Sequence, residues 1–179
     1  MTLTVKQRGV LKGIRVGAAI TIVVILGSIV VGGRMALPPE ASAGERLALA
    51  IRADAFIALW LAISVGLLAK HRFFTPEDID GGGLSRGSET AGVLQSTLQN
   101  SLEQSVLAVL VHLGWSVLMP VSWMVASPAA VLLFLSGRVL FARGYRGGAP
   151  SRALGFALTF YPTVLMLIFV IVAAIRNLI

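Results

Sequence analysis

Five apolar segments dominate this sequence and constrain its fold more than any other feature. They run over about residues 14–31, 47–69, 92–119, 122–141 and 153–175. A helix needs about 20 apolar residues to cross the roughly 30 Å hydrocarbon core of a bilayer. The segments therefore predict an all-α integral membrane protein, with little of the 179-residue chain left for a separate soluble domain.

The composition agrees with this fold class and excludes a soluble enzyme. Hydrophobic residues make up 56% of the chain and charged residues only 13%, whereas a soluble domain carries about 25% charged residues. The chain has no cysteine, which excludes disulfides, cysteine nucleophiles and thiolate metal sites. Its two histidines, His71 and His112, argue against a multi-histidine site, so we predict no metal.

The basic residues set the expected orientation in the membrane. They lie at the ends of the apolar segments, which favours a role in topology over binding of nucleic acid. With the N-terminus in the cytoplasm, 11 of the 15 fall on the inner side and 4 on the outer side. Because cytoplasmic loops carry the excess of Lys and Arg, we predict a cytoplasmic N-terminus and an outside C-terminus. The expected location is a bacterial inner membrane, with membrane lipids and no nucleic acid as partners.

The first apolar segment has two interpretations. A basic start, an apolar run and the triplet Ala41-Ser42-Ala43 resemble a secretory signal with its cleavage site. About ten residues, including two prolines, separate the run from the triplet, and the run is long enough to cross on its own. We therefore predict a retained transmembrane helix over residues 1–33 and an outside loop over residues 34–46.

The polar connection over residues 70–89 is predicted to lie outside the bilayer. It contains Pro76, three consecutive glycines and the acidic residues Glu77, Asp78 and Asp80, which is typical of a solvated loop. A calcium-binding loop needs acidic ligands at alternating positions and a closing glutamate. The spacing of these acids does not match that pattern.

A polar stripe marks the beginning of the third segment. At 3.6 residues per turn, Ser96, Gln99, Asn100 and Glu103 share one helix face. An ionisable group inside a bilayer usually faces the bundle interior or a wet cavity. Two interpretations remain open: the stripe packs against other helices, with Arg138 as the partner of the carboxylate, or it lines a pocket for a polar ligand.

A second concentration of polar residues begins near the end of the fourth segment and continues into the connection that follows it. Four arginines gather there with Tyr145 and several glycines; they are Arg138, Arg143, Arg146 and Arg152. Arginine forks bind carboxylates through paired hydrogen bonds, so the cluster suits an anionic ligand. The alternative is a basic turn that contacts lipid head groups.

The order and spacing of these residues resemble the MAPEG family, the membrane-associated proteins in eicosanoid and glutathione metabolism. Asn100-x-x-Glu103 lies on one helix, and Gly137-Arg138-x-x-Phe141-x-x-Gly144-Tyr145 ends the next. Arg152, followed by Gly155-Phe156, then opens the last helix. The resemblance covers residues 47–179, so the first helix is an addition to the family's usual four.

The resemblance implies a left-handed four-helix bundle that assembles as a homotrimer. It also implies a glutathione site between subunits near the cytoplasmic face, where a lipophilic electrophile would be conjugated or reduced. By this resemblance Arg152 is the catalytic residue that stabilises the glutathione thiolate. Asn100, Glu103, Arg138 and Tyr145 are the residues expected to hold the peptide.

Two positions depart from the family pattern. Ser96 stands where glutathione-binding relatives commonly have an arginine, and Phe141 stands where some have a tyrosine. Both changes remove polar contacts to glutathione. They favour an alternative in which the protein is a non-catalytic trimer that binds a lipid or a partner, with the polar residues serving helix packing. A transporter is disfavoured because the chain shows no internal repeat.

The remaining polar and aromatic residues are interpreted as structural. His112 is expected to be packed or hydrogen-bonded. Asp54 is expected to reach the outer interface or to pair across helices, because its neighbour Arg52 points in another direction. The three tryptophans suit interfacial or lipid-facing positions; they are Trp60, Trp115 and Trp123.

Overall fold

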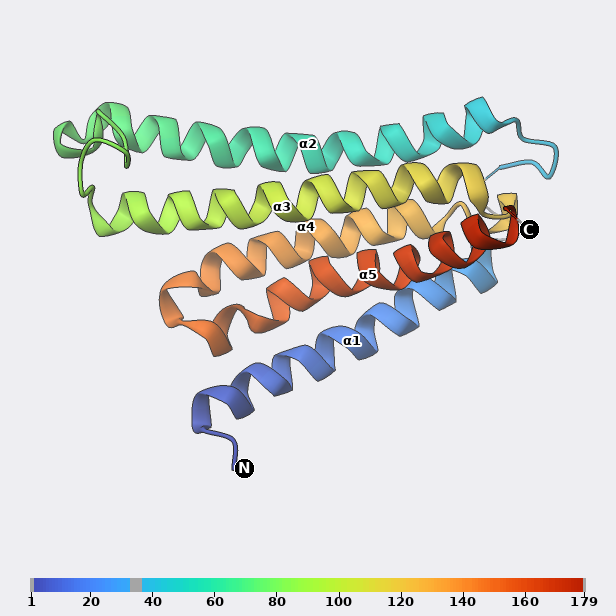
Figure 1. The fold of residues 1–179 in the computed structure, drawn as a ribbon, viewed down its shortest axis with the longest axis horizontal. Helices are drawn as coiled ribbons and strands as arrows, with labels where there is room; N and C mark the ends of the chain where they lie inside the picture. Colours follow the sequence, from blue (N-terminus) through green and yellow to red (C-terminus); the bar gives the residue numbers. More distant parts are fainter. Residues whose placement is uncertain (1, 33–36, 179) are drawn as a thin grey trace.

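The computed structural model describes residues 2–32 and 37–178 and is helical almost throughout. Its long helices are α1 (Val5–Gly32), α2 (Ala43–Phe74), α3 (Glu89–Leu118), α4 (Ala126–Gly144) and α5 (Ala149–Arg176) (Figure 1). Short 3₁₀ turns lie in the connections, namely η1 (Pro76–Asp78), η2 (Val121–Trp123) and η3 (Tyr145–Gly147). Among the described residues, five helices are long and apolar enough to cross a membrane. The predicted all-helical membrane fold with an additional N-terminal helix is confirmed.

Successive helices run in alternating directions along the bundle (Figure 1). The N-terminus and the α2–α3 and α4–α5 connections lie at one end, which we call the N-terminal end. The α3–α4 connection and the C-terminus lie at the opposite end. Helix α2 packs on α3 and α4, whereas α5 packs on α3, α4 and α1. Part of the predicted loop over residues 34–46, together with Gly33, lies outside the described residues.

Capping residues start the first two helices before their apolar runs begin. Ser42 caps α2: its hydroxyl accepts a hydrogen bond from the Glu45 amide at 3.3 Å, and its own amide donates to the Glu45 carboxylate at 2.8 Å. This reciprocal capping box satisfies two amides that the helix leaves free. Thr4 and Gln7 make the same exchange at the start of α1. Both helices are therefore longer than their apolar segments.

Glycines allow α4 and α5 to approach closely beside the arginine cluster. A Cβ atom on Gly137 would lie 2.7 Å from the Gly155 carbonyl oxygen, and one on Gly155 would clash with the Phe141 backbone. Small residues at a helix contact bring the two backbones together. This contact fixes Arg138 and Phe141 of α4 against the first turns of α5.

A second set of small residues docks α1 on α5. A Cβ atom on Gly9 would lie 2.9 Å from Pro150 Cβ, and one on Gly13 would lie 2.8 Å from Ala153 Cβ. Gly17 lies against Ala157 in the same way. The three glycines recur every fourth residue, so they form one face of α1. The additional helix thus packs directly beside the beginning of α5.

The core is apolar and aromatic toward the opposite end of the bundle. Trp115 has no exposed surface and packs with Trp123 and Phe169, at centroid distances of 5.9 and 6.0 Å. The expectation of a lipid-facing position is wrong for Trp115, because the side chain is buried and its indole N–H is satisfied inside the protein by the Trp123 carbonyl. Arg46 caps α3 here, donating to the carbonyls of Ser116 and Val117 at 2.5 to 2.7 Å.

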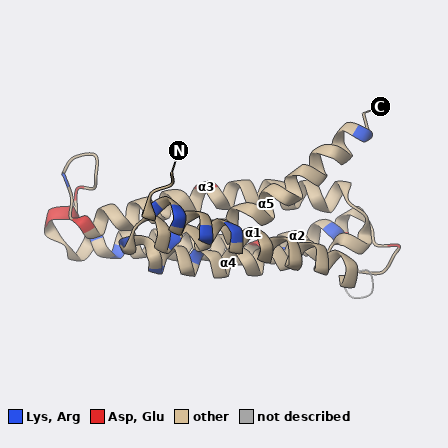
Figure 2. Cartoon of the chain, turned by 90° about the horizontal axis from the view of Figure 1, so that it is seen from below, with Lys and Arg blue, Asp and Glu red and all other residues tan. Residues whose placement is uncertain are grey.

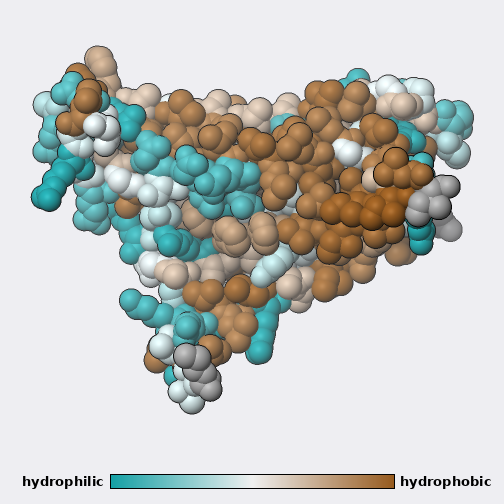
Figure 3. Space-filling view, viewed as in Figure 1, coloured by the Kyte–Doolittle hydropathy of each residue, from teal (hydrophilic) through white to brown (hydrophobic). Residues whose placement is uncertain are grey.

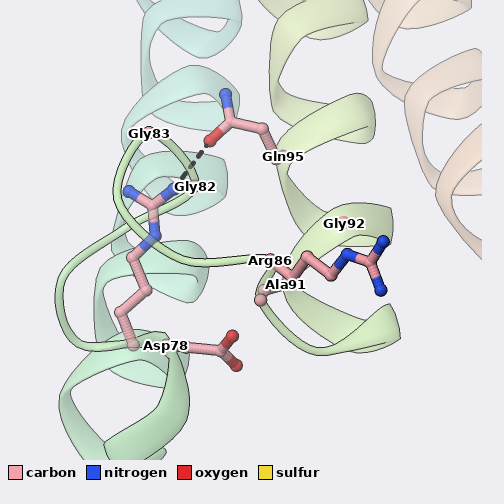
Figure 4. Close-up of a pocket in the computed structure, with 9 residues that line it drawn as sticks. Asp78, Gly82, Gly83, Arg86, Ala91, Gly92 and Gln95 are labelled. Carbon is pink, nitrogen blue, oxygen red and sulfur yellow. Dashed lines mark hydrogen bonds between the residues drawn. The ribbon is translucent and has the colours of Figure 1, made fainter.

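The α2–α3 connection is held to the helices by one carboxylate. Asp78 is buried; it accepts hydrogen bonds from the amide and the hydroxyl of Ser88, both at 2.6 Å, and lies 2.9 Å from His71 Nε2. The prediction of a solvated loop is therefore wrong for Asp78. Beside it lies a cavity of about 310 Å³, lined by Gln95 and Arg86 among others, where Gln95 accepts a hydrogen bond from the Arg72 guanidinium at 3.1 Å (Figure 4).

We predict that Asp78 makes stability depend on pH in the acid range. The Ser88 hydroxyl and amide, with a smaller contribution from His71, hold the pKa of Asp78 below its usual value of 3.8. The stabilising effect is present above the unfolded pKa and is lost as the pH falls through the lowered folded pKa. In thermal melts of the detergent-solubilised protein, Asp78→Asn should lower Tm at neutral pH, and its difference from wild type should shrink below pH 3.8. A constant difference across this range would contradict the assignment.

Candidate functional site

Arg138 lies at the centre of the polar residues identified from the sequence. It is fully buried on α4. Its Nη1 donates to Asn100 Oδ1 of α3 at 2.8 Å, and its Nη2 donates to Thr159 Oγ1 of α5 at 2.6 Å. One guanidinium thus joins three helices.

Two aromatic rings complete the surroundings of Arg138. Its guanidinium carbon lies 4.6 Å from the Phe141 ring centroid and 5.7 Å from that of Phe134. In the described part of the chain, no carboxylate lies within salt-bridge distance of Arg138. The expected ion pair with Glu103 does not form within one chain, because Glu103 is exposed and accepts a hydrogen bond from Gln99 at 3.0 Å.

Most of the polar stripe of α3 faces away from the chain's own bundle, and only Asn100 reaches Arg138 in the core. Gln95, Ser96, Gln99 and Glu103 are exposed, and Asn100 is half-buried. The space-filling view shows hydrophilic side chains within a largely hydrophobic face (Figure 3). Gln95 accepts a hydrogen bond from Arg72 of α2, and Gln99 donates to Glu103 of the same helix. For Ser96, Gln99 and Glu103 the interpretation as packing between helices stays a prediction that concerns contacts with another copy of the chain. The polar residues that do pack inside lie on the neighbouring face of α3, among them Ser101, Gln104 and Ser105.

Arg152 lies in the first turn of α5, on the other side of Phe141 from Arg138. Its guanidinium carbon is 4.3 Å from the Tyr145 ring centroid and 5.9 Å from that of Phe141. The two rings contact each other edge to face at 5.6 Å. Cation–π contacts of this kind contribute about 0.5–2 kcal/mol each. Arg152 is half-buried, and no described carboxylate pairs with it.

The structure therefore brings together most of the residues predicted from the sequence. Arg138, Tyr145 and Arg152 contact one another through Phe141, and Asn100 joins them through Arg138. Glu103 shares a helix with Asn100, but its carboxylate lies at the surface. The arrangement offers one guanidinium in the core, which bonds to Asn100 and Thr159 while its Nε has no partner among the described residues, and one guanidinium available to an anion near the surface.

Two polar contacts were missed by the sequence analysis. Thr159, one turn beyond Gly155 on α5, is the second partner of Arg138. Asp54 of α2 bonds to His112 of α3, with 2.6 Å between Oδ1 and Nδ1, and both side chains are buried. Pairing across helices was one of the two expectations for Asp54. Its partner lies 58 residues away, and no local spacing identifies it.

A comparison with protein families identifies the helical unit that carries this site. The family model for the MAPEG family matches residues 47–172, which include nearly all of α2 and α5 and the whole of α3 and α4. Helix α1 lies outside the match. No protein of curated function and no solved structure shows significant similarity to the chain. Since the match covers more than half of the chain and contains the residues around Arg138 and Arg152, the protein belongs to the MAPEG family.

Proposed function

We propose that this protein binds glutathione at Arg152 and uses it to conjugate or reduce lipophilic electrophiles within the membrane. The observation that carries the proposal is the half-buried Arg152 guanidinium, which is stacked on Tyr145 and has no described carboxylate partner. A fixed cation in a partly dehydrated site favours the anionic form of a thiol, and the thiolate is the nucleophile. Arg152 is thus the proposed catalytic residue.

The side chains of the candidate site, taken together, suit the charges of glutathione. The tripeptide carries two carboxylates, one ammonium group and one thiol. Arg152 offers a fork of donors, while the exposed Glu103 and Gln99 offer acceptors for an ammonium group. Arg138 and Asn100 already bond to each other, so their proposed role is to hold Phe141 and α3 in place for Tyr145 and Arg152.

We further propose that the site lies between copies of the chain in a homotrimer. Glu103 is exposed on a helix long and apolar enough to span a membrane, and a carboxylate facing lipid is costly. A neighbouring copy of the chain would cover the polar stripe and enclose the site.

Native mass spectrometry of the detergent-solubilised protein should therefore give three times the 18.8-kDa mass of one chain. Glu103→Arg should dissociate this assembly, because it places a reversed charge in the covered stripe. Glu89→Arg, the same change at the exposed start of α3, is the matched control and should leave the mass unchanged. A monomeric wild type, or a Glu103→Arg variant that keeps the full mass, argues against an intersubunit site.

Glutathione binding should depend on Arg152. Hydrogen bonds to charged groups contribute about 1.5–3 kcal/mol, so calorimetry should show Arg152→Ala binding glutathione about 10- to 150-fold more weakly than wild type. Arg143→Ala removes an exposed cation of the same cluster and serves as the control. An absence of heat with wild type at millimolar glutathione, or an equal loss in Arg143→Ala, would overturn the proposed site.

We also propose that the N-terminus lies in the cytoplasm of a bacterial cell and the C-terminus outside the inner membrane. The support is the gathering of Lys and Arg toward the N-terminal end of the bundle (Figure 2), since basic residues remain on the cytoplasmic side. An alkaline phosphatase fused after residue 178 should be active in the periplasm, and one fused at the α2–α3 connection should be inactive. The reverse result would invert the orientation.

One observation favours a second candidate, a non-catalytic trimer that binds a lipid or a partner. Asn100 and Thr159 occupy both terminal nitrogens of Arg138, which gives this residue a packing role. The calorimetric comparison separates the two candidates, because the second predicts no glutathione binding at Arg152.

A further inference from the structure

The two halves of the bundle differ in charge. All eight acidic residues of the chain lie between Glu40 and Glu103. Helices α1, α4 and α5 therefore carry no acidic side chain, although each carries arginines. By contrast, the last turns of α2 and the α2–α3 connection carry Lys70, Arg72 and Arg86 together with nearby acids. The positive-inside rule places Lys and Arg on the cytoplasmic side of a membrane. It does not require that acidic and basic residues lie on different helices.

Helix α1 adds cations to the half of the bundle that has no acids. Its Gly9 and Gly13 contact Pro150 and Ala153, the residues on either side of the Ser151-Arg152 pair. The first turns of α1 thus lie beside the α4–α5 connection. Figure 2 shows the basic residues of these elements along one stretch of the molecule, and acidic residues near its two ends.

The cations of α1 form a stripe that turns apolar farther along the helix. Arg8, Lys12 and Arg15 recur at the spacing of one helix face, and all three are exposed. The same face continues with exposed apolar side chains, namely Ala19, Ile22, Val23, Leu26 and Val30. The glycines that contact α5 lie on another side of the helix. We call this exposed stripe the α1 face.

We propose that the α1 face is a binding site for an anionic phospholipid. The phosphodiester would lie against Arg8, Lys12 and Arg15, none of which has a carboxylate partner among the described residues. The acyl chains would follow the apolar residues from 19 to 30, which extend about 17 Å at 1.5 Å per residue. This length matches one leaflet of a hydrocarbon core roughly 30 Å thick. The site lies on the helix outside the family match, and it does not depend on glutathione binding.

Native mass spectrometry with added lipids tests the site on the full-length protein. Phosphatidylglycerol should bind wild type more tightly than phosphatidylcholine with the same acyl chains. Lys12→Gln/Arg15→Gln should weaken phosphatidylglycerol binding about 30-fold, because each cation near an anionic lipid surface contributes about 1 kcal/mol. Lys70→Gln/Arg86→Gln removes the same charge from exposed positions in the other half of the bundle and should have little effect.

Each other result would count against the proposal. Equal losses of phosphatidylglycerol affinity in the two double variants would show a general effect of net charge and no specific site on the α1 face. Unchanged binding in Lys12→Gln/Arg15→Gln would place the lipid elsewhere. Glycerol phosphate added in excess should not displace the lipid, because it lacks the acyl chains. Displacement by this soluble anion would show that the cations bind a free phosphate and that the apolar part of the α1 face plays no role.

Discussion

The buried guanidinium of Arg138 is the interaction on which the geometry of the candidate site depends. Burying a charge in a protein without partners costs several kcal/mol. Here the Asn100 amide oxygen, the Thr159 hydroxyl and two aromatic rings replace the lost water. These partners come from three helices, so the charge is stable only when α3, α4 and α5 are correctly placed. The placement of these three helices also sets the positions of Phe141 and Arg152.

The candidate site and the assembly of the protein are physically connected. Asn100 and Thr159 bond to Arg138 in the core, whereas Ser96, Gln99 and Glu103 of the polar stripe face outward from a membrane helix. A single chain would expose this stripe to lipid. Glu103 and its exposed neighbours are therefore residues that one chain cannot enclose, which supports the proposal of a site shared by two copies.

The sequence predicted the five helices and most members of the site because hydropathy and helical spacing are local properties. The apolar segments identified every long helix, and the family motifs identified Asn100, Arg138, Tyr145 and Arg152 as neighbours. The rotation of each helix about its axis was not predictable from local patterns. Because of this rotation Glu103 faces outward, and Thr159, not Glu103, is a partner of Arg138. The Asp54–His112 contact depends in the same way on how α2 and α3 face each other.

The capping of α3 by Arg46 has a consequence for how the protein fits its bilayer. The last carbonyls of a helix lack partners within the helix and normally need water. Arg46 supplies the donors for Ser116 and Val117, so these two carbonyls do not depend on water. The guanidinium is itself a cation, which is costly in hydrocarbon and favours the membrane interface. The contact therefore holds the start of α2 and the end of α3 at one depth, and a change in bilayer thickness would move the two helix ends together.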